Sequence, residues 1–132
     1  MSSVEDVRCR LLGSWLVTSY EERPSVDAPW TPVYGHDVVG LIVFDRSGWC
    51  SVGVAGDGRY DSYFGRFELV DASTGSDGDR GTIDYSVVAS DIPDQLLADR
   101  RQPFRLRHDS LVLGDGELWR RVCTRAVLGA EV

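Results

Sequence analysis

One glutamate and two tyrosines are the residues of this 132-residue sequence best suited to acid–base chemistry. Glu21 ends an alternating run that begins at Trp15, and the two-residue period of a strand places both side chains on one face. A carboxyl group inside an apolar cavity has a raised pKa and can act as a general acid or base. Tyr63 and Tyr85 could donate a hydrogen bond to a substrate carbonyl and stabilise developing negative charge. Glu21, Tyr63 and Tyr85 are therefore the catalytic candidates.

The same three residues also fit structural roles. Glu21 stands next to Glu22 and Arg23, as a carboxylate at a solvated strand end would. Inward tyrosines can hydrogen-bond each other without acting on any substrate, because perturbed groups occur in purely structural networks as well. Both interpretations stay open at the level of the sequence.

Ligand-binding candidates are the remaining residues that alternation directs inward on the same and neighbouring strands. Gly65 and Ala89 are small and would leave room for a ligand. A mostly apolar lining with a few polar groups is typical of a small-molecule site. The predicted lining consists of Val17, Ser19, Gly65, Phe67, Val87, Ala89, Phe104 and Leu106.

The sequence gives little support for cysteine, metal or cofactor chemistry. Three cysteines, Cys9, Cys50 and Cys123, are odd in number and widely spaced, so we expect buried small hydrophobes rather than disulfides or a zinc site. A catalytic cysteine would need His36 or His108 beside it in the fold. Neither histidine has a metal-ligand partner at suitable spacing, so no metal is predicted. All 14 basic residues are arginine, which removes lysine-based cofactor chemistry, and no cofactor is expected.

Charge and hydropathy argue against nucleic acid and membranes as partners of this protein. The formal net charge of -7 argues against nucleic acid or an anionic membrane, since both reward clustered positive charge. No apolar run approaches the roughly 20 residues of a membrane-spanning helix. The first six residues lack the basic and apolar regions of a signal peptide, and a cytoplasmic location is expected.

Alternating segments separated by hairpin-length loops predict a single all-β domain over residues 1–132. A short helix over 3–12, capped by Ser3 with Asp6 three residues on, precedes the strands. The predicted strands are 14–22, 38–44, 49–54, 62–70, 82–90, 101–108, 111–113 and 117–123. Residues 23–32 and 71–81 are expected to be loops, 94–98 one helical turn, and 124–132 a tail. With no helix long enough for a parallel crossover, we predict an antiparallel up-and-down barrel of about eight strands over 13–123.

The order of several short segments resembles the bacterial lipocalin-like domain family. These segments are Leu12-Gly13-Ser14-Trp15, Tyr34-Gly35-His36-Asp37, Gly40-Leu41-Ile42-Val43-Phe44, the Gly48 turn leading to Ser51-Val52, Tyr63-Phe64-Gly65-Arg66-Phe67-Glu68, Gly81-Thr82-Ile83, Leu111-Val112-Leu113 and Trp119-Arg120-Arg121-Val122. The resemblance implies a small barrel with an internal cavity for an apolar ligand. It also implies that Arg121 stacks on Trp15 and that Trp119 helps to close the same end. Where the family often has a histidine, this chain has Tyr85.

Together these observations predict a protein that binds a small apolar or aromatic molecule in its barrel. One hypothesis is a cofactor-free cyclase or isomerase of a bacterial natural-product pathway, acting by orientation and a few hydrogen bonds. The alternatives are a non-catalytic carrier or sensor, and an interaction module whose barrel is filled. Residues 38–54 are apolar on both faces, so their inward face is undetermined and a homodimer contact there is possible.

Overall fold

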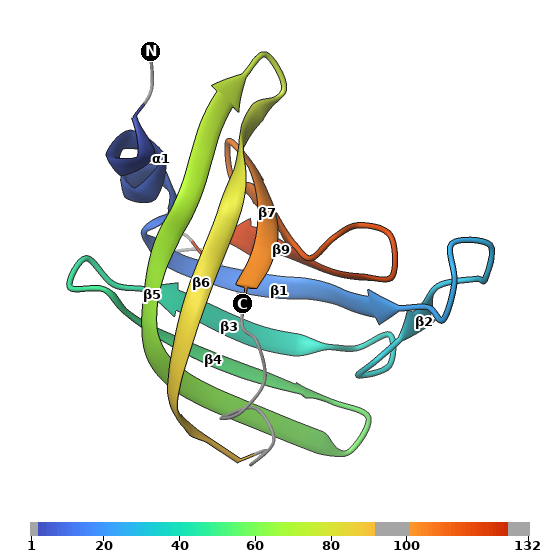
Figure 1. Ribbon diagram of the computed structural model, residues 1–132. Helices are drawn as coiled ribbons and strands as arrows, with labels where there is room; N and C mark the ends of the chain where they lie inside the picture. The colour runs from blue at the N-terminus through green and yellow to red at the C-terminus, as the bar shows by residue number, and fades with distance from the viewer. Residues whose placement is uncertain (1–2, 92–100, 127–132) are drawn as a thin grey trace.

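A computed structural model describes residues 3–91 and 101–126, and this part of the chain forms one helix and nine strands (Figure 1). The elements in chain order are α1 (Val4–Leu11), β1 (Gly13–Glu22), β2 (Thr31–Pro32), β3 (Val39–Phe44), β4 (Trp49–Gly56), β5 (Arg59–Gly75), β6 (Gly78–Ser90), β7 (Arg101–Arg107), β8 (Ser110–Leu113) and β9 (Trp119–Arg125). The helical turn predicted over 94–98 lies outside the described residues.

The sheet closes into an antiparallel barrel, as predicted. Strands β3 to β9 follow one another in chain order, and β1 pairs with both β3 and β9, so eight strands form a ring. Strand β2 is an addition of two residues that pairs only with the end of β1, within the segment predicted to be a loop. Closure pairs each barrel strand on both sides over part of its length, whereas Tyr85–Ser90 of β6 pair with β5 alone among the described residues.

Helix α1 covers one end of the barrel. Ser3 accepts a hydrogen bond from the Asp6 backbone, and the Asp6 side chain accepts one from the Ser3 backbone, which confirms the predicted capping box. Val7 and Leu11 are fully buried in the core. The apolar face of the helix therefore plugs this end.

An ion pair fastens the same helix to the β5–β6 hairpin. The Arg10 guanidinium donates hydrogen bonds to the buried Asp79 carboxylate at 2.8 and 3.1 Å, and the Thr74 hydroxyl donates one at 2.6 Å. Hydrogen bonding to Arg10 lowers the pKa of Asp79, so its charged form is favoured in the folded state.

We expect Asp79→Asn to lower the free energy of unfolding by about 1 kcal/mol at pH 7. Because the folded-state pKa of Asp79 is lowered, the wild-type advantage is present above 3.8, the ordinary pKa of aspartate, and is lost as the pH falls through the folded value. Urea unfolding at several pH values checks this. Asp77→Asn at the exposed hairpin tip is the control, and equal losses in both variants would contradict the prediction.

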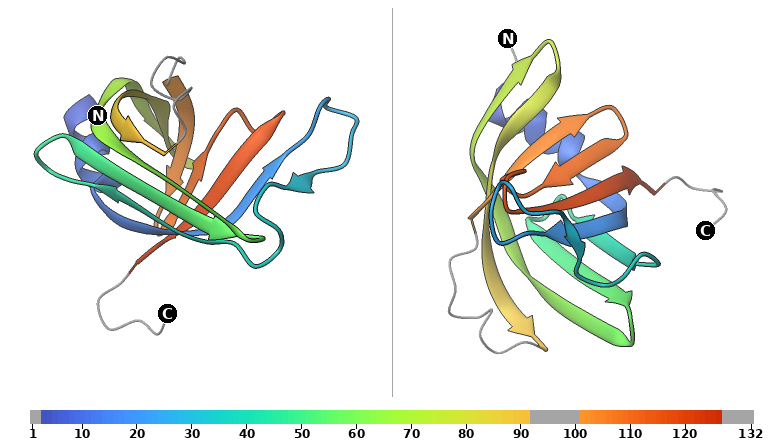
Figure 2. Two further views of the ribbon diagram at one scale, coloured as in Figure 1. Left: turned by 90° about the horizontal axis from the view of Figure 1, so that it is seen from below. Right: turned by 90° about the vertical axis from the view of Figure 1, so that its right-hand side faces the viewer.

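Strands β5 and β6 are longer than the alternation indicated. The expected loop over 71–81 is instead the outer part of this hairpin, and register pairs run to Gly75 and Gly78. Figure 2 shows the two strands extending beyond the rest of the barrel. The polar composition of this segment reflects its position beyond the core, where Asp79 is held by Arg10. Strand β9 likewise continues to Arg125, into the segment predicted to be a tail.

The cysteines divide into two kinds. Cys50 and Cys123 are buried, as expected, and burial raises the pKa of their thiols to about 11 and about 12. Cys9 is exposed on α1, where the prediction of burial was wrong, because the core-facing positions of the helix are Val7 and Leu11.

A disulfide-forming thiol reagent at pH 8 should therefore modify one cysteine per folded chain. Attack requires the thiolate, which burial disfavours at Cys50 and Cys123. Mass spectrometry should place the label on Cys9, and Cys9→Ser should abolish it, whereas denatured protein should take up three labels. Rapid labelling of Cys50 or Cys123 in the folded chain would show that the barrel opens more readily than this packing indicates.

The stacking partner of Trp15 differs from the one implied by the resemblance. The guanidinium of Arg125, not Arg121, lies 3.9 Å from the Trp15 ring centroid, and Arg125 also donates hydrogen bonds to the Leu12 and Arg10 carbonyl oxygens. The register pairs Trp15 with Arg125 and Glu22 with Trp119. In an antiparallel pair the start of one strand meets the end of the other. Trp119 and Arg121 consequently lie at the opposite end of the barrel from Trp15.

Candidate functional site

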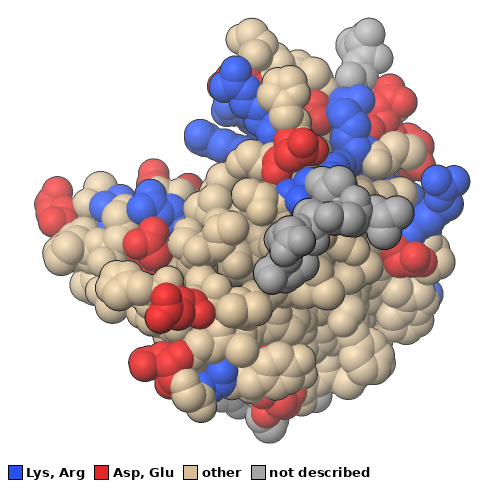
Figure 3. All heavy atoms as spheres, turned by 180° about the vertical axis from the view of Figure 1, so that it is seen from behind, with Lys and Arg blue, Asp and Glu red and all other residues tan. Residues whose placement is uncertain are grey.

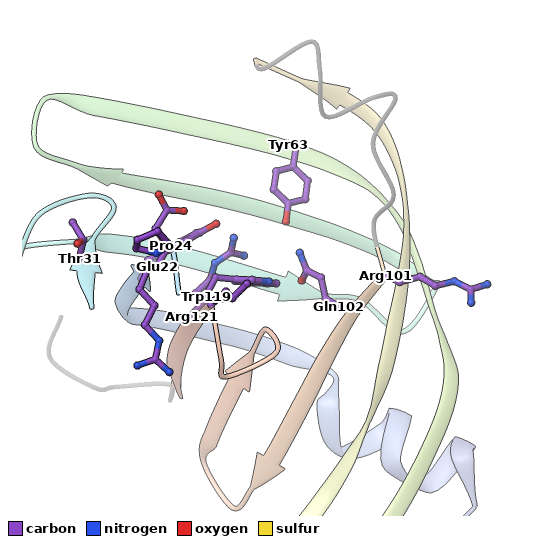
Figure 4. Close-up of a pocket in the computed structure, with 11 residues that line it drawn as sticks. Glu22, Pro24, Thr31, Tyr63, Arg101, Gln102, Trp119 and Arg121 are labelled. Carbon is purple, nitrogen blue, oxygen red and sulfur yellow. The ribbon is translucent and has the colours of Figure 1, made fainter. Parts of the chain in front are cut away.

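A pocket of about 730 Å³ lies where β1, β5, β7 and β9 meet, at the end away from α1 (Figure 4). It combines aromatic rings with charged and amide groups. The lining residues are Tyr20, Glu22, Arg23, Pro24, Thr31, Tyr63, Arg101, Gln102, Leu118, Trp119 and Arg121. Of the catalytic and ligand-binding residues predicted from the sequence, Tyr63 alone belongs to this lining.

A bulge in β1 decides which of its residues reach the pocket. The β1–β9 register shifts between Val17 and Ser19, and the hydroxyl of the intervening Thr18 donates a hydrogen bond to the Val122 carbonyl oxygen at 3.0 Å. A bulge adds one residue to the strand and reverses the alternation beyond it. Tyr20 and Glu22 therefore line the pocket, and Ser19 and Glu21 do not.

The predicted inward position of Glu21 is thus wrong. Its carboxylate lies 2.9 Å from the Arg120 guanidinium in an ion pair. Arg120 also stacks on the Trp30 ring at 4.1 Å, with Arg23 at 4.1 Å as well. Glu21 belongs to this outer cluster rather than to an apolar cavity. Trp30 is not a lining residue of the pocket and packs between these two arginines.

Most of the other inward predictions are confirmed in direction, but these side chains fill the core. Phe67 packs against Phe44 with ring centroids 5.0 Å apart, and Val17, Phe104 and Leu106 are at most 4% exposed. Their packing, together with the helix, fills the end of the barrel near α1. None of them lines the pocket at the other end, so their ligand-binding role stays a prediction.

A second bulge lies in the β5–β6 pair, beside the two small residues Gly65 and Ala89 that were expected to leave room for a ligand. The β5–β6 register passes from Phe64↔Ala89 to Gly65↔Val87, which leaves Val88 without a partner and reverses the alternation of β6. Ala89 consequently lies beside Phe64 on an outer groove, not inside the barrel. A Cβ atom at Gly65 would lie 2.1 Å from the Ser86 carbonyl oxygen. The space beside Gly65 is thus occupied by backbone, not by room for a ligand.

Tyr63 and Tyr85 occupy different depths. Tyr63 points from β5 toward Gln102 and Arg121 across the pocket (Figure 4). Tyr85 is 6% exposed and does not line the pocket, and its ring centroid lies 6.5 Å from that of Phe44. Burial raises the pKa of Tyr85 well above its ordinary value, so at neutral pH it is a protonated phenol. Only Tyr63 could touch a bound molecule directly.

Arg121 is the most unusual residue of the pocket. It is 5% exposed, its guanidinium carbon lies 4.5 Å from the Tyr20 ring centroid, and its Nε and Nη1 atoms have no hydrogen-bond partner. The Gln102 Oε1 atom is also buried without a partner. Buried polar groups are nearly always hydrogen-bonded, so unpaired ones call for an explanation.

Aromatic residues hold the wall around Arg121. The Tyr20 ring contacts Trp119 and Tyr34 at centroid distances of 6.2 and 5.5 Å. The Tyr34 hydroxyl donates a hydrogen bond to Asp61 at 2.6 Å, and burial together with this bond raises its pKa. Sequence alternation missed Tyr20 because of the bulge. A signal was nevertheless present: antiparallel pairing of the first and last strands places Arg121 near residue 20, not near residue 15.

A broad apolar surface covers the outside of β1, β3 and β4. Strand β3 turns Gly40, Ile42 and Phe44 inward and Val39 and Leu41 outward, which settles the face that the sequence left open. Val39 is 66% exposed and Leu41 44% exposed. Figure 3 shows this side of the molecule, with a wide area free of charged side chains. The predicted homodimer contact stays a prediction.

Among the described residues, no helix is long and apolar enough to cross a membrane, and no group of three or more His, Cys, Asp or Glu side chains could hold a metal ion. Comparison of the chain with models of protein families, with curated proteins and with solved structures found no match. The lipocalin-like family assignment therefore stays a prediction, and the barrel itself is the shared feature that the structure confirms.

Proposed function

We propose that this barrel binds a small organic molecule in the pocket at its open end. The observation that carries the proposal is the aromatic wall of Tyr20, Tyr63 and Trp119 around a pocket of about 730 Å³. This volume falls within the range of roughly 300–1,000 Å³ that is usual for small-molecule sites. A closed barrel with one end plugged and the other hollow is compatible with such binding.

Binding of the neutral fluorescent probe N-phenyl-1-naphthylamine tests the proposal. We expect a saturable rise in probe fluorescence with the wild-type protein, and about a five- to tenfold weaker affinity for Trp119→Ala, because stacking on a large aromatic ring is lost. Trp49→Ala is the matched control, since Trp49 is 40% exposed and does not line the pocket. Equal weakening in both variants, or no saturable binding, would contradict the proposal.

Conversion of the bound molecule is the second candidate, as in a cofactor-free cyclase or isomerase. It rests on the Tyr63 hydroxyl, which points into the pocket and could donate a hydrogen bond to a substrate oxygen. Glu21 no longer supports it, because this carboxylate pairs with Arg120 away from the pocket. Native mass spectrometry can identify a molecule retained during purification. If wild-type protein alters that molecule and Tyr63→Phe does not, the protein is an enzyme; if neither alters it, a carrier or sensor is favoured.

A further inference from the structure

The buried guanidinium of Arg121 lacks a counter-ion within the described part of the protein. No carboxylate oxygen of residues 3–91 and 101–126 forms an ion pair within 4.0 Å of an Arg121 nitrogen. Two of its nitrogen atoms also lack hydrogen-bond partners. A buried charge without a partner is costly, so a fold retains it where something else supplies the partner.

The position of Arg121 points to the pocket as the source of that partner. One face of the guanidinium stacks on Tyr20 at 4.5 Å, which fixes its plane. Tyr63 points toward Arg121 and Gln102 from the strand across the pocket (Figure 4). The Gln102 Oε1 atom is another buried polar atom of the lining without a hydrogen-bond partner. A molecule in this pocket could therefore supply partners for donors of Arg121 and for an acceptor of Gln102.

Local charge agrees with this arrangement. The pocket lining contains three arginines and one carboxylate, Glu22, in a chain whose formal net charge is -7. Arg101 pairs with Asp84 at 3.9 Å and is directed away from the other lining residues (Figure 4). Arg23 stacks on Trp30 outside the lining, so Arg121 supplies the positive charge inside the pocket. A buried guanidinium in the wall of this pocket favours an anion there over a cation. The stacking ring of Trp119 favours an aromatic or apolar body next to that anion.

We infer that the molecule bound in this pocket carries an oxyanion, either a carboxylate or a phosphate ester, which binds to Arg121 and sits on an aromatic or apolar body. This inference rests on the proposed function and specifies its ligand class. Guanidinium groups bind carboxylates and phosphates through short, charge-assisted hydrogen bonds. A hydroxyl or amino group on the same molecule could donate to the Gln102 oxygen, which would satisfy the second unpartnered group.

Three probes that share a naphthalene ring separate the effect of the charge from that of the aromatic body. We would measure displacement of N-phenyl-1-naphthylamine by 2-naphthoate, by its neutral amide 2-naphthamide and by 2-naphthyl phosphate at pH 7.5. The wild-type protein should bind 2-naphthoate or 2-naphthyl phosphate about 10- to 100-fold more tightly than the amide, since a hydrogen bond to a charged group is worth more than a neutral one. The tighter of the two anions identifies the head group.

Variants then assign the effect to one residue. Arg121→Gln should reduce the preference for the anion to less than about threefold, while Arg107→Gln, which removes an equal charge from the exposed end of β7, should preserve it. Circular dichroism verifies that each variant is folded, and the wild-type comparison stands without any variant. If wild-type protein binds the amide as tightly as both anions, or binds N-phenyl-1-naphthylamine but none of the three competitors, the inference is overturned although the proposed function holds. If it binds no probe, the proposed function fails as well.

Discussion

Replacing Trp15 by alanine is expected to lower the free energy of unfolding by about 3–5 kcal/mol. Trp15 is fully buried at the plugged end of the barrel. Its Nε1–H group donates a hydrogen bond to the Leu11 carbonyl oxygen at 2.9 Å, and Arg125 stacks on its ring at 3.9 Å. The substitution removes a large ring, the partner of a helix-terminal carbonyl and the surface on which Arg125 rests. A small domain has only about 5–15 kcal/mol in total, so the loss would be a large share.

Urea unfolding followed by far-ultraviolet circular dichroism measures this loss without relying on tryptophan fluorescence. Trp49→Ala is the control, because the Trp49 ring is 40% exposed. It makes a cation–π contact with Arg66, whose guanidinium carbon lies 5.3 Å from the ring centroid. We expect the control to lose less than about 1.5 kcal/mol. A similar loss for both variants would mean that the plugged end does not depend on Trp15.

Gly65→Ala should destabilise the barrel by about 3 kcal/mol or more, although it adds a single methyl group. An added Cβ atom would lie 2.1 Å from the Ser86 carbonyl oxygen and 2.9 Å from the Val87 Cα atom. Both atoms belong to backbone in the paired strand β6, which cannot retreat without opening the β5–β6 register at its bulge. This close approach of two backbones is what requires glycine here.

Gly53→Ala on the neighbouring strand β4 is the matched comparison. Its added Cβ atom would meet the Tyr60 hydroxyl at 2.9 Å, and Tyr60 is a 64% exposed side chain that can rotate away. We expect a change within about 1 kcal/mol for this variant. Thermal and urea unfolding of the two proteins side by side tests the difference. Equal stability of Gly65→Ala and wild type would show that the bulge can shift at little cost.

The two large effects concern positions that the sequence marked for different reasons. Trp15 was identified as an anchor of the first strand, and its burial is confirmed. Gly65 was interpreted as space for a ligand, and the structure instead places the β6 backbone there. The residue type marked both positions as special. Only the paired strand β6 shows that the missing side chain of Gly65 makes room for backbone and not for a ligand.

In the candidate site, too, alternation along the sequence predicted some positions and strand register decided others. Tyr63 was predicted from alternation and lines the pocket, whereas Glu21 was predicted by the same rule and does not. Between Trp15 and Glu21 lies the Thr18 bulge, which reverses the phase of every residue after it. The resemblance implied that Arg121 stacks on Trp15 and that Trp119 closes the same end, whereas the β1–β9 register places Arg121 and Trp119 at the opposite end.

By itself the sequence determined the helix and most of the strands of this protein, but neither β2 nor the outer part of the β5–β6 hairpin. The Ser3 cap fixed the helix, and alternation with hairpin-length turns was sufficient for an antiparallel barrel, because both are local patterns of side chains and backbone. The tertiary structure alone decided which side chains meet. Register between β1 and β9, and the bulges at Thr18 and Val88, depend on hydrogen bonds between segments far apart in the chain. Those bonds set Trp15 against Arg125 at the plugged end and bury Arg121 in the pocket wall, where its Nε and Nη1 atoms have no hydrogen-bond partner.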